Sequence, residues 1–143
     1  MAPCPWPACL VALLGSCAAA TARAQQDSGT APRVRVEGVY TAAQAERGQV
    51  TFRRICAQCH VVGQFSGRSF RRAWAGRPTY ELFELIRTTM PQDKPGTLGR
   101  QDYTDVVAYF LSLSGAPAGP AELAAEPDTL RRVLFPPAPP PRN

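Results

Sequence analysis

The amino-acid sequence predicts an all-α domain with about three main helices, and three observations lead to this prediction. Apolar residues recur at helical spacing in three separate segments, residues 41–57, 79–90 and 101–113. The stretches between these segments are rich in Gly, Pro and Ser, which favour turns and loops. Alternation typical of a strand is limited to Val34 and Val36. A chain of 143 residues suits one small domain with a single core.

The first 24 residues have the features of an export signal. Residues 8–20 are apolar, but the run is too short and too rich in alanine for a good membrane span. Ala22-Arg23-Ala24 then provides a small-x-small cleavage pattern, so we expect a signal peptide over residues 1–24 and a flexible leader over residues 25–39. Lipidation is an alternative, because Leu14-Gly15-Ser16-Cys17 loosely resembles a bacterial lipobox. Cleavage after Ala24 leaves two cysteines, one histidine and one methionine.

Thr41 is predicted to open the first helix. Thr41-Ala-Ala-Gln44 fits a capping box, in which the Thr hydroxyl and the Gln amide each satisfy a backbone N–H group. The helix should extend to about Ala57. Its apolar or small face is formed by Ala45, Gly48, Phe52 and Ile55.

The segment from His60 to Trp74 is predicted to be irregular, because Gly and Ser separate isolated aromatic residues. The second helix should begin near Thr79, just after Pro78. It should end before Pro91, since proline disfavours helical geometry in the residue that precedes it.

The third helix is predicted from Gln101 to Leu113 and ends at Ser114-Gly115. Residues 116–143 then form a Pro-rich extension with one short helical candidate, Pro127–Val133. The prolines at its end are typical of polyproline or disordered chain. Three helices with long connections make a thin core, so a large apolar ligand is expected to fill the middle.

Cys56-Ala-Gln-Cys59-His60 is a C-x-x-C-H sequence, the attachment pattern for haem c. Two thiols at this spacing form thioethers with the two vinyl groups of a porphyrin, and the adjacent His becomes an iron ligand. Three alternatives are weaker. A thioredoxin-like redox pair usually lies in a βαβ unit, a disulfide would close a very small loop, and zinc normally needs four Cys or His ligands. We therefore predict one covalent haem c.

Met90 is the predicted second iron ligand. His60 is the only histidine of the chain, so a second histidine ligand from the same chain is excluded. Met90 is the only methionine after signal removal, and it lies in a loop after a helix. A neutral thioether opposite histidine favours reduced iron. The alternative for a lone Met beside Pro is loop packing.

Residues 40–114 resemble the bacterial class I cytochromes c, which carry one haem with His and Met ligands. Three segments support the resemblance in order: Gly48-x3-Phe52-x3-Cys56-Ala-Gln-Cys59-His60, Ile86-Arg-Thr-Thr-Met90-Pro91, and Asp105-Val-Val-Ala-Tyr109-Phe-Leu-Ser-Leu. The resemblance implies a cytochrome c-like fold over residues 40–115, with its helices wrapped around one haem. It also implies that Gly48 and Phe52 pack against the C-terminal helix near Tyr109.

One position departs from the family pattern. After the haem-binding histidine the family usually has Gly-Pro, and the proline carbonyl accepts a hydrogen bond from the histidine ring. Here the matching residues are Gly67-Arg68, so Arg68 occupies the proline position. Its carbonyl is expected to be able to take over the bond, with less rigidity behind His60.

Trp74 and Arg77 are candidate partners of the haem propionates, because indole N–H and guanidinium groups donate to carboxylates. Core packing of Trp74 with a solvated Arg77 is the alternative. The resemblance also suggests a set of apolar residues for the walls of the haem pocket. These residues are Phe65, Phe70, Leu82, Phe83 and Ile86.

These observations predict an electron carrier of the periplasm, not an enzyme. The formal charge of +5 comes from scattered arginines with no run longer than two, which favours a basic docking face for acidic redox proteins over nucleic-acid binding. The protein would act as a monomer or as the electron-transfer subunit of a dehydrogenase or oxidase. The alternatives are an open-site haem enzyme or gas sensor, if Met90 does not bind iron, and a haem-free binding module with a disulfide.

Overall fold

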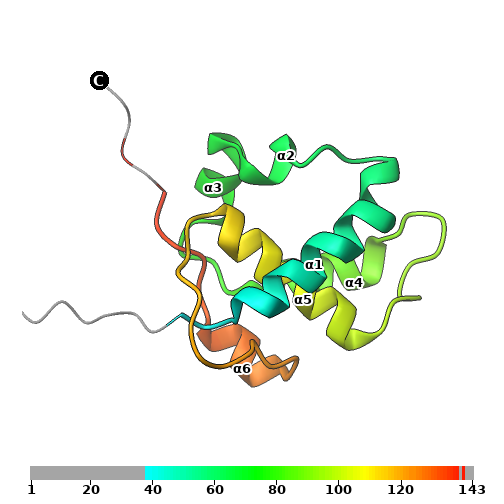
Figure 1. The fold of residues 1–143 in the computed structure, drawn as a ribbon. Helices are drawn as coiled ribbons and strands as arrows, with labels where there is room; N and C mark the ends of the chain where they lie inside the picture. The colour runs from blue at the N-terminus through cyan, green and yellow to red at the C-terminus, as the bar shows by residue number, and fades with distance from the viewer. Residues whose placement is uncertain (1–37, 139, 141–143) are drawn as a thin grey trace, which may run out of the picture. The chain divides into compact units, whose positions relative to one another are not determined.

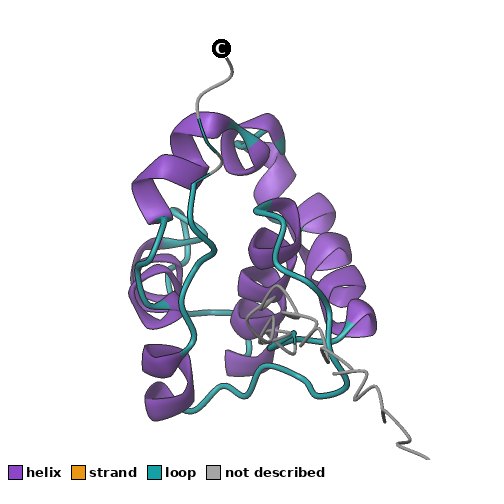
Figure 2. Cartoon of the chain, turned by 90° about the vertical axis from the view of Figure 1, so that its left-hand side faces the viewer, coloured by secondary structure: helices purple, strands orange, loops and turns teal. Residues whose placement is uncertain are grey.

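The elements of the fold are known from a computed structural model, which describes residues 38–138 and 140. The predicted signal peptide and most of the predicted leader lie outside these residues. The helices are α1 (Ala42–Arg54), the 3₁₀ helix η1 (Cys56–Gln58), α2 (Gly63–Ser66), α3 (Arg68–Trp74), α4 (Thr79–Thr89), α5 (Arg100–Leu113) and α6 (Pro127–Arg132) (Figure 1). The described part of the chain contains no strand, only an isolated bridge between Pro78 and Leu134 (Figure 2). The all-α prediction is therefore confirmed.

Helices α1 and α5 cross at close range (Figure 1). Gly48 makes this approach possible, since a Cβ atom added there would lie 1.9 Å from the backbone oxygen of Asp105. One turn further on, the ring of Phe52 lies 5.8 Å from that of Tyr109 and 5.9 Å from that of Phe110. The expected packing of Gly48 and Phe52 against this helix is confirmed, with Gly48 facing Asp105.

The start of α1 confirms one half of the predicted capping box. The Thr41 hydroxyl accepts a hydrogen bond from the Gln44 backbone N–H at 3.1 Å. The other half is wrong, because the buried Gln44 amide pairs with the backbone of Leu123 instead. Its Nε2 donates to the Leu123 carbonyl at 2.9 Å, and its Oε1 accepts from the Leu123 N–H at 2.7 Å. An amide offers one donor side and one acceptor side, so it satisfies both groups of a buried peptide segment.

Helix α1 ends at Arg54, a few residues before the predicted end, and η1 follows it at Cys56. The segment from His60 to Trp74 also differs from the prediction, because it forms the short helices α2 and α3 instead of an irregular stretch. Helices this short are not stable by themselves. Here they pack onto α5, where the rings of Phe65 and Phe70 lie 4.4 Å and 5.8 Å from that of Phe110.

The two remaining long helices agree with the sequence. Helix α4 begins directly after Pro78 and ends at Thr89, before the Met90-Pro91 pair. Helix α5 is buried along most of its length, from Tyr103 to Leu111. It ends at Leu113 with Ser114 as its C-cap, and Gly115 follows with a φ of +89°, a conformation that favours glycine.

The C-terminal segment contributes to the core. Leu123, Leu130 and Phe135 are each at most 3% exposed. Helix α6 lies where a helix was predicted, and the Leu130 carbonyl accepts a hydrogen bond from the Thr79 hydroxyl at 2.8 Å. Residues 116–135 therefore add buried apolar side chains to the core that the three long helices form.

Arg47 joins this segment to α1 and α5. Its guanidinium donates to Asp105 at 2.8 Å and to Glu122 at 2.9 Å. The two carboxylates hold the guanidinium in its charged form, so the pKa of Arg47 is raised further above its already high ordinary value. Arg47 therefore serves a structural role.

No helix among residues 38–138 and 140 has both the length and the apolar character that crossing a membrane requires.

Candidate haem-binding site

The C-x-x-C-H residues form one tight turn after α1. The backbone N–H groups of Cys59 and His60 donate to the Cys56 carbonyl at 3.1 Å and 2.9 Å. Cys56 is half-buried against the core, whereas Cys59 is exposed, and both are free thiols. The turn thus brings two unpaired sulfur atoms and one imidazole together, which is the arrangement that covalent haem attachment needs.

The environment of the thiols gives the alternatives little support. Burial raises the pKa of the Cys56 thiol, although a backbone hydrogen bond opposes the effect. A redox-active C-x-x-C pair depends on a lowered thiol pKa. No group of three or more His, Cys, Asp or Glu side chains that could hold a metal ion occurs within the described ranges. A zinc site has no ligand set there.

The imidazole of His60 is half-buried and has two neighbours in α2. The ring of Phe65 packs edge-on against it with centroids 5.5 Å apart. The Nδ1 atom lies 3.2 Å from Oε1 of Gln64. With Nδ1 engaged in this way, Nε2 is the ring nitrogen that remains for a metal ion.

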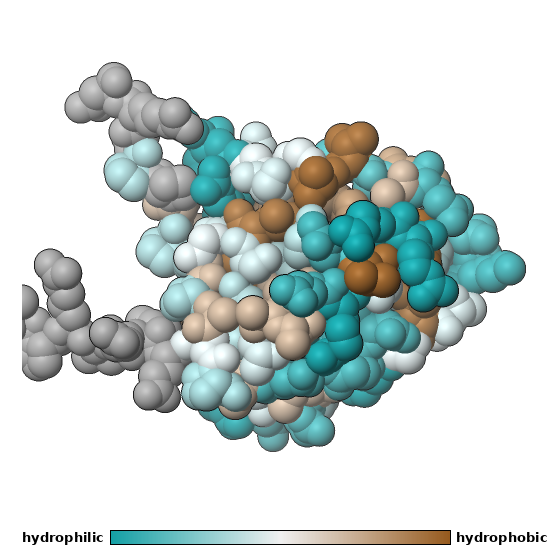
Figure 3. All heavy atoms as spheres, in the orientation of Figure 1, coloured by the Kyte–Doolittle hydropathy of each residue, from teal (hydrophilic) through white to brown (hydrophobic). Residues whose placement is uncertain are grey.

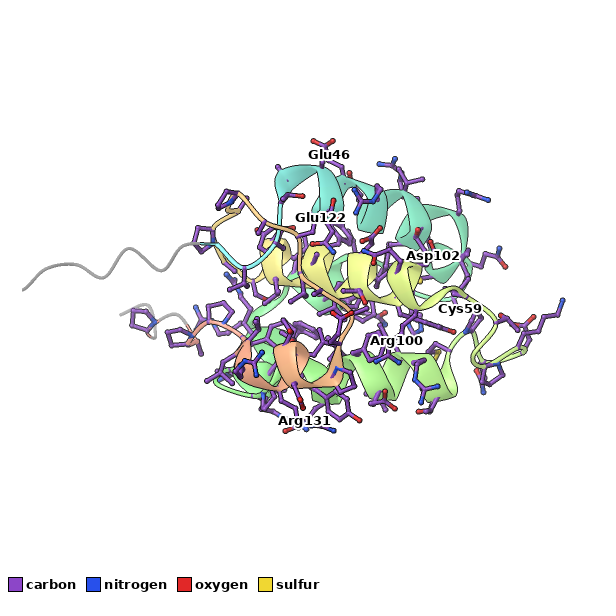
Figure 4. All side chains as sticks on the ribbon, turned by 90° about the horizontal axis from the view of Figure 1, so that it is seen from below. Glu46, Cys59, Arg100, Asp102, Glu122 and Arg131 are labelled. Atoms are coloured by element: carbon purple, nitrogen blue, oxygen red, sulfur yellow. The ribbon has the colours of Figure 1, made fainter. Side chains whose placement is uncertain are left out.

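Met90 belongs to a different segment from the C-x-x-C-H turn. It follows the last residue of α4, and its N–H donates to the Ile86 carbonyl at 2.9 Å. Its carbonyl accepts a hydrogen bond of 2.7 Å from the hydroxyl of Tyr103, a buried residue of α5. The α4–α5 loop and the turn that contains Cys59 lie toward the same end of the α1–α5 pair (Figures 1 and 4). The bond to Tyr103 therefore anchors the backbone of Met90 to α5, the helix that packs against α1.

Trp74 and Arg77 contact each other. The guanidinium carbon of Arg77 lies 4.2 Å from the centre of the Trp74 ring, and its Nε donates to Glu81 at 2.8 Å. Trp74 also packs against Phe70 and Phe135, with ring centroids 6.0 Å and 5.9 Å apart. These contacts are those of a packed indole and a surface ion pair, and the propionate role of both residues stays a prediction.

The expected pocket walls separate into two groups. Leu82 and Phe83 are buried in the core, with 3% and 0% of their surface exposed. Phe65, Phe70 and Ile86 are only partly buried. The three partly buried side chains are the ones that retain surface for a ligand.

Arg71 fits a bound carboxylate but was not among the residues chosen from the sequence. Its Nε is shielded from solvent and has no hydrogen-bond acceptor among the described residues. Leaving a buried donor without a partner costs about 1–3 kcal/mol, more when the group is charged. A haem propionate is a carboxylate that would satisfy this donor, so Arg71 supports the fit of haem to this part of the fold. In the sequence Arg71 is one half of an Arg71-Arg72 pair, and nothing in this local pattern indicates a buried donor.

The surface around the turn is basic. No Asp or Glu occurs from residue 47 to residue 80. The arginines of this stretch without an ion pair to a described residue are Arg53, Arg54, Arg68, Arg71 and Arg72, and we call them the basic face. Glu46 and Glu122 lie toward the N-terminal half of α1, away from Cys59 (Figure 4).

Apolar side chains also reach the surface beside the motif. Val61 and Val62, which directly follow His60, are 68% and 43% exposed. Hydrophobic patches lie among hydrophilic neighbours in the space-filling view (Figure 3). Exposed apolar residues next to a basic face are typical of a surface that contacts another protein.

Comparison with known families identifies the class of the domain. Residues 43–110 match the family described as cytochrome c oxidase, cbb3-type, subunit III. The matched range is a little less than half of the 143 residues and includes the C-x-x-C-H turn and Met90. The chain therefore contains a c-type cytochrome domain with an all-α, cytochrome c-like fold. Neither a curated protein nor a solved structure matches the chain.

Proposed function

We propose that this protein is a monohaem c-type cytochrome that carries single electrons, with haem c bound covalently through Cys56 and Cys59. The C-x-x-C-H turn within the matched cytochrome domain carries the proposal. Bound haem supplies a one-electron couple between ferric and ferrous iron. The half-buried Cys56 and the exposed Cys59 hold one edge of the group, so that a protein working outside the cell does not lose it.

His60 and Met90 are the proposed iron ligands. The hydrogen bond at Nδ1 leaves Nε2 of His60 for the iron. The backbone of Met90 is anchored at the end of α4, which supports its thioether as the second ligand. With His60 and Met90 both holding the iron, no position would remain for a substrate, and the bound haem would supply electron transfer without catalysis.

The carboxylates of the haem are proposed to meet arginine and tryptophan donors. Arg71 has an unused Nε, which supports it as a partner. Trp74 and Arg77 remain candidates, although Arg77 already donates to Glu81. A guanidinium that binds a propionate neutralises its charge and keeps the group in one orientation.

We further propose that the partners are acidic redox proteins that bind the basic face. Four of its five arginines are exposed, and the described residues offer them no carboxylate. Small redox probes test this, since oxidation by an anionic oxidant should slow with added salt while oxidation by a cationic one should speed up. Equal salt dependence for both probes would contradict the docking role.

We also propose that the protein is exported to the periplasm. Its parts are then a signal peptide over residues 1–24, a leader over 25–39, the cytochrome domain over 40–115 and a C-terminal extension over 116–143. The cleavage pattern at Ala22-Arg23-Ala24 supports this assignment. The protein acts alone or as the electron-transfer subunit of a dehydrogenase or oxidase. Mass spectrometry of the exported protein distinguishes cleavage after Ala24 from lipidation at Cys17.

Acid–organic extraction of the exported protein, followed by spectra of both oxidation states, tests the function. We expect haem to stay with the polypeptide and the oxidised form to show a weak long-wavelength sulfur-to-iron charge-transfer band. Replacing Cys56 and Cys59 by Ala should make the haem extractable, and Met90→Ala should remove only the band. Haem retained without the band would instead support an open-site enzyme or sensor. A matured sample without haem would contradict the cytochrome function.

A further inference from the structure

Gln64 is the second residue of α2 and contacts the proposed iron ligand His60. This residue lies four positions after His60, and its Oε1 is 3.2 Å from Nδ1 of the imidazole. The ring of Phe65 packs edge-on against the imidazole, with its centroid 5.5 Å from that of His60. The imidazole is thus held by two consecutive residues of one short helix.

The chemistry of a metal-bound imidazole determines the direction of this hydrogen bond. A neutral imidazole has one N–H group, so when Nε2 binds iron the proton must be on Nδ1. Nδ1 then donates, and the amide oxygen of Gln64 accepts. A ligand histidine generally donates its second N–H to a carbonyl or carboxylate, which sets the ring orientation and raises the basicity of the ligand.

The structure also explains why a side chain takes this role. The position expected to provide a backbone carbonyl, Arg68, is the first residue of α3. A carbonyl in the first turn of a helix points along the axis and accepts from the N–H four residues later. The preceding carbonyl, that of Gly67, accepts from the Arg71 N–H at 3.1 Å. Within the described residues, the hydrogen bond of the His60 ring is the one to Gln64.

We propose that Gln64 is the positioning residue for His60, which holds the imidazole through Nδ1 and tunes the redox potential of the haem. The proposal rests on the proposed function, in which His60 binds iron. A stronger acceptor at residue 64 gives the imidazole more negative character and stabilises ferric iron, whereas loss of the acceptor has the opposite effect.

Spectroelectrochemical titration of three haem-loaded variants of the full chain tests the proposal. Gln64→Glu provides a stronger acceptor, and Gln64→Leu removes it. Gln58→Glu is the matched control, because Gln58 is exposed in the same motif and donates to the Arg54 carbonyl, not to His60. It adds the same negative charge close to His60 without an acceptor at Nδ1, and it loses only the exposed hydrogen bond to the Arg54 carbonyl.

We expect Gln64→Glu to lower the midpoint potential more than Gln58→Glu does, and Gln64→Leu to raise it. The ratio of reduced to oxidised protein at the wild-type midpoint should change by up to about tenfold, which is about 59 mV for a one-electron couple. Thermal unfolding of each variant reports any loss of fold. Such a loss would not by itself shift the midpoint potentials of Gln64→Glu and Gln64→Leu in opposite directions.

Two results would overturn the role of Gln64: an unchanged potential in Gln64→Leu, or equal shifts in Gln64→Glu and Gln58→Glu. Either would leave the cytochrome function intact, provided that wild-type haem resists extraction. Extractable haem in the wild type would contradict the proposed function itself, so the two failures are distinguishable.

Discussion

Replacing Gly48 by Ala should separate α1 from α5 and destabilise the protein. The added Cβ would lie 1.9 Å from the Asp105 oxygen, 2.4 Å from the Asp105 carbonyl carbon and 2.9 Å from the Val106 nitrogen. All three are backbone atoms, so no side-chain rotation relieves the overlap and the helices must move apart. Overpacking usually costs about 1–3 kcal/mol, and an overlap with rigid backbone atoms puts this site at the upper end, about 3 kcal/mol. The better helix propensity of Ala returns about 1 kcal/mol. We expect a net loss of about 2 kcal/mol.

Thermal and denaturant unfolding of the exported, haem-loaded protein measures this loss. For a domain of this size about 2 kcal/mol lowers Tm by roughly 10 °C. Gly63→Ala is the matched control, because a Cβ at Gly63 meets nothing within 4 Å. It should leave the stability unchanged or slightly higher. Equal Tm values for the two variants would refute the close approach of α1 and α5 at Gly48.

Three further predictions concern stability. Gln44→Leu leaves the N–H and the carbonyl of Leu123 buried without partners, so the free energy of unfolding measured by denaturant titration should fall by about 2–4 kcal/mol. A fall of less than about 1 kcal/mol would contradict the pairing. Tyr103→Phe removes the hydroxyl that donates to the Met90 carbonyl and should cost about 0.5–1.5 kcal/mol in the same assay, whereas an unchanged value would argue against the bond. The hydrogen bond from Arg87 lowers the pKa of Glu84 below its ordinary value. The stabilising effect of this ion pair is therefore complete above the ordinary pKa and is lost as the pH falls through the lowered pKa. The stability difference between wild type and Glu84→Gln should therefore be constant at neutral pH and vanish in acid, and a pH-independent difference would contradict this ion pair.

Composition alone does not tell which arginines of this protein form ion pairs. Among the described residues, Arg47, Arg77, Arg87 and Arg131 each donate to carboxylates of the same chain. The basic face has no such partners among the described residues. Ion pairs on an exposed surface contribute little to stability, so unpaired arginines there cost the fold little and remain available for a partner.

Features of the candidate site that are local in the chain could be predicted from the sequence. The two thiols and the imidazole of Cys56, Cys59 and His60 are contiguous, and one turn of backbone is enough to bring them together. The end of α4 before Met90 follows from the proline after it. The contact of His60 with Gln64 was not predicted. Residues four positions apart are neighbours in a helix, so the spacing would have indicated this contact if a helix after the motif had been predicted.

Two other features depended on residues far apart in the sequence. The Gln44 side chain pairs with a backbone segment 79 residues away, which no local pattern indicates. The unused Nε of Arg71 depends on how α3 is buried, and α3 itself forms because Phe70 packs on α5.

The sequence by itself determined the all-α class, the three long helices and the attachment motif, because each follows from residue spacing or from the chemistry of adjacent side chains. The close approach at Gly48 was implied by the resemblance to the class I cytochromes c. Only the tertiary structure decided that α2 and α3 are helical, that residues 116–135 complete the core, and which group faces the His60 ring. Helices of four to seven residues are stabilised by the surface on which they pack, not by their own propensity. Buried amides and arginines likewise take the partners that folding brings to them.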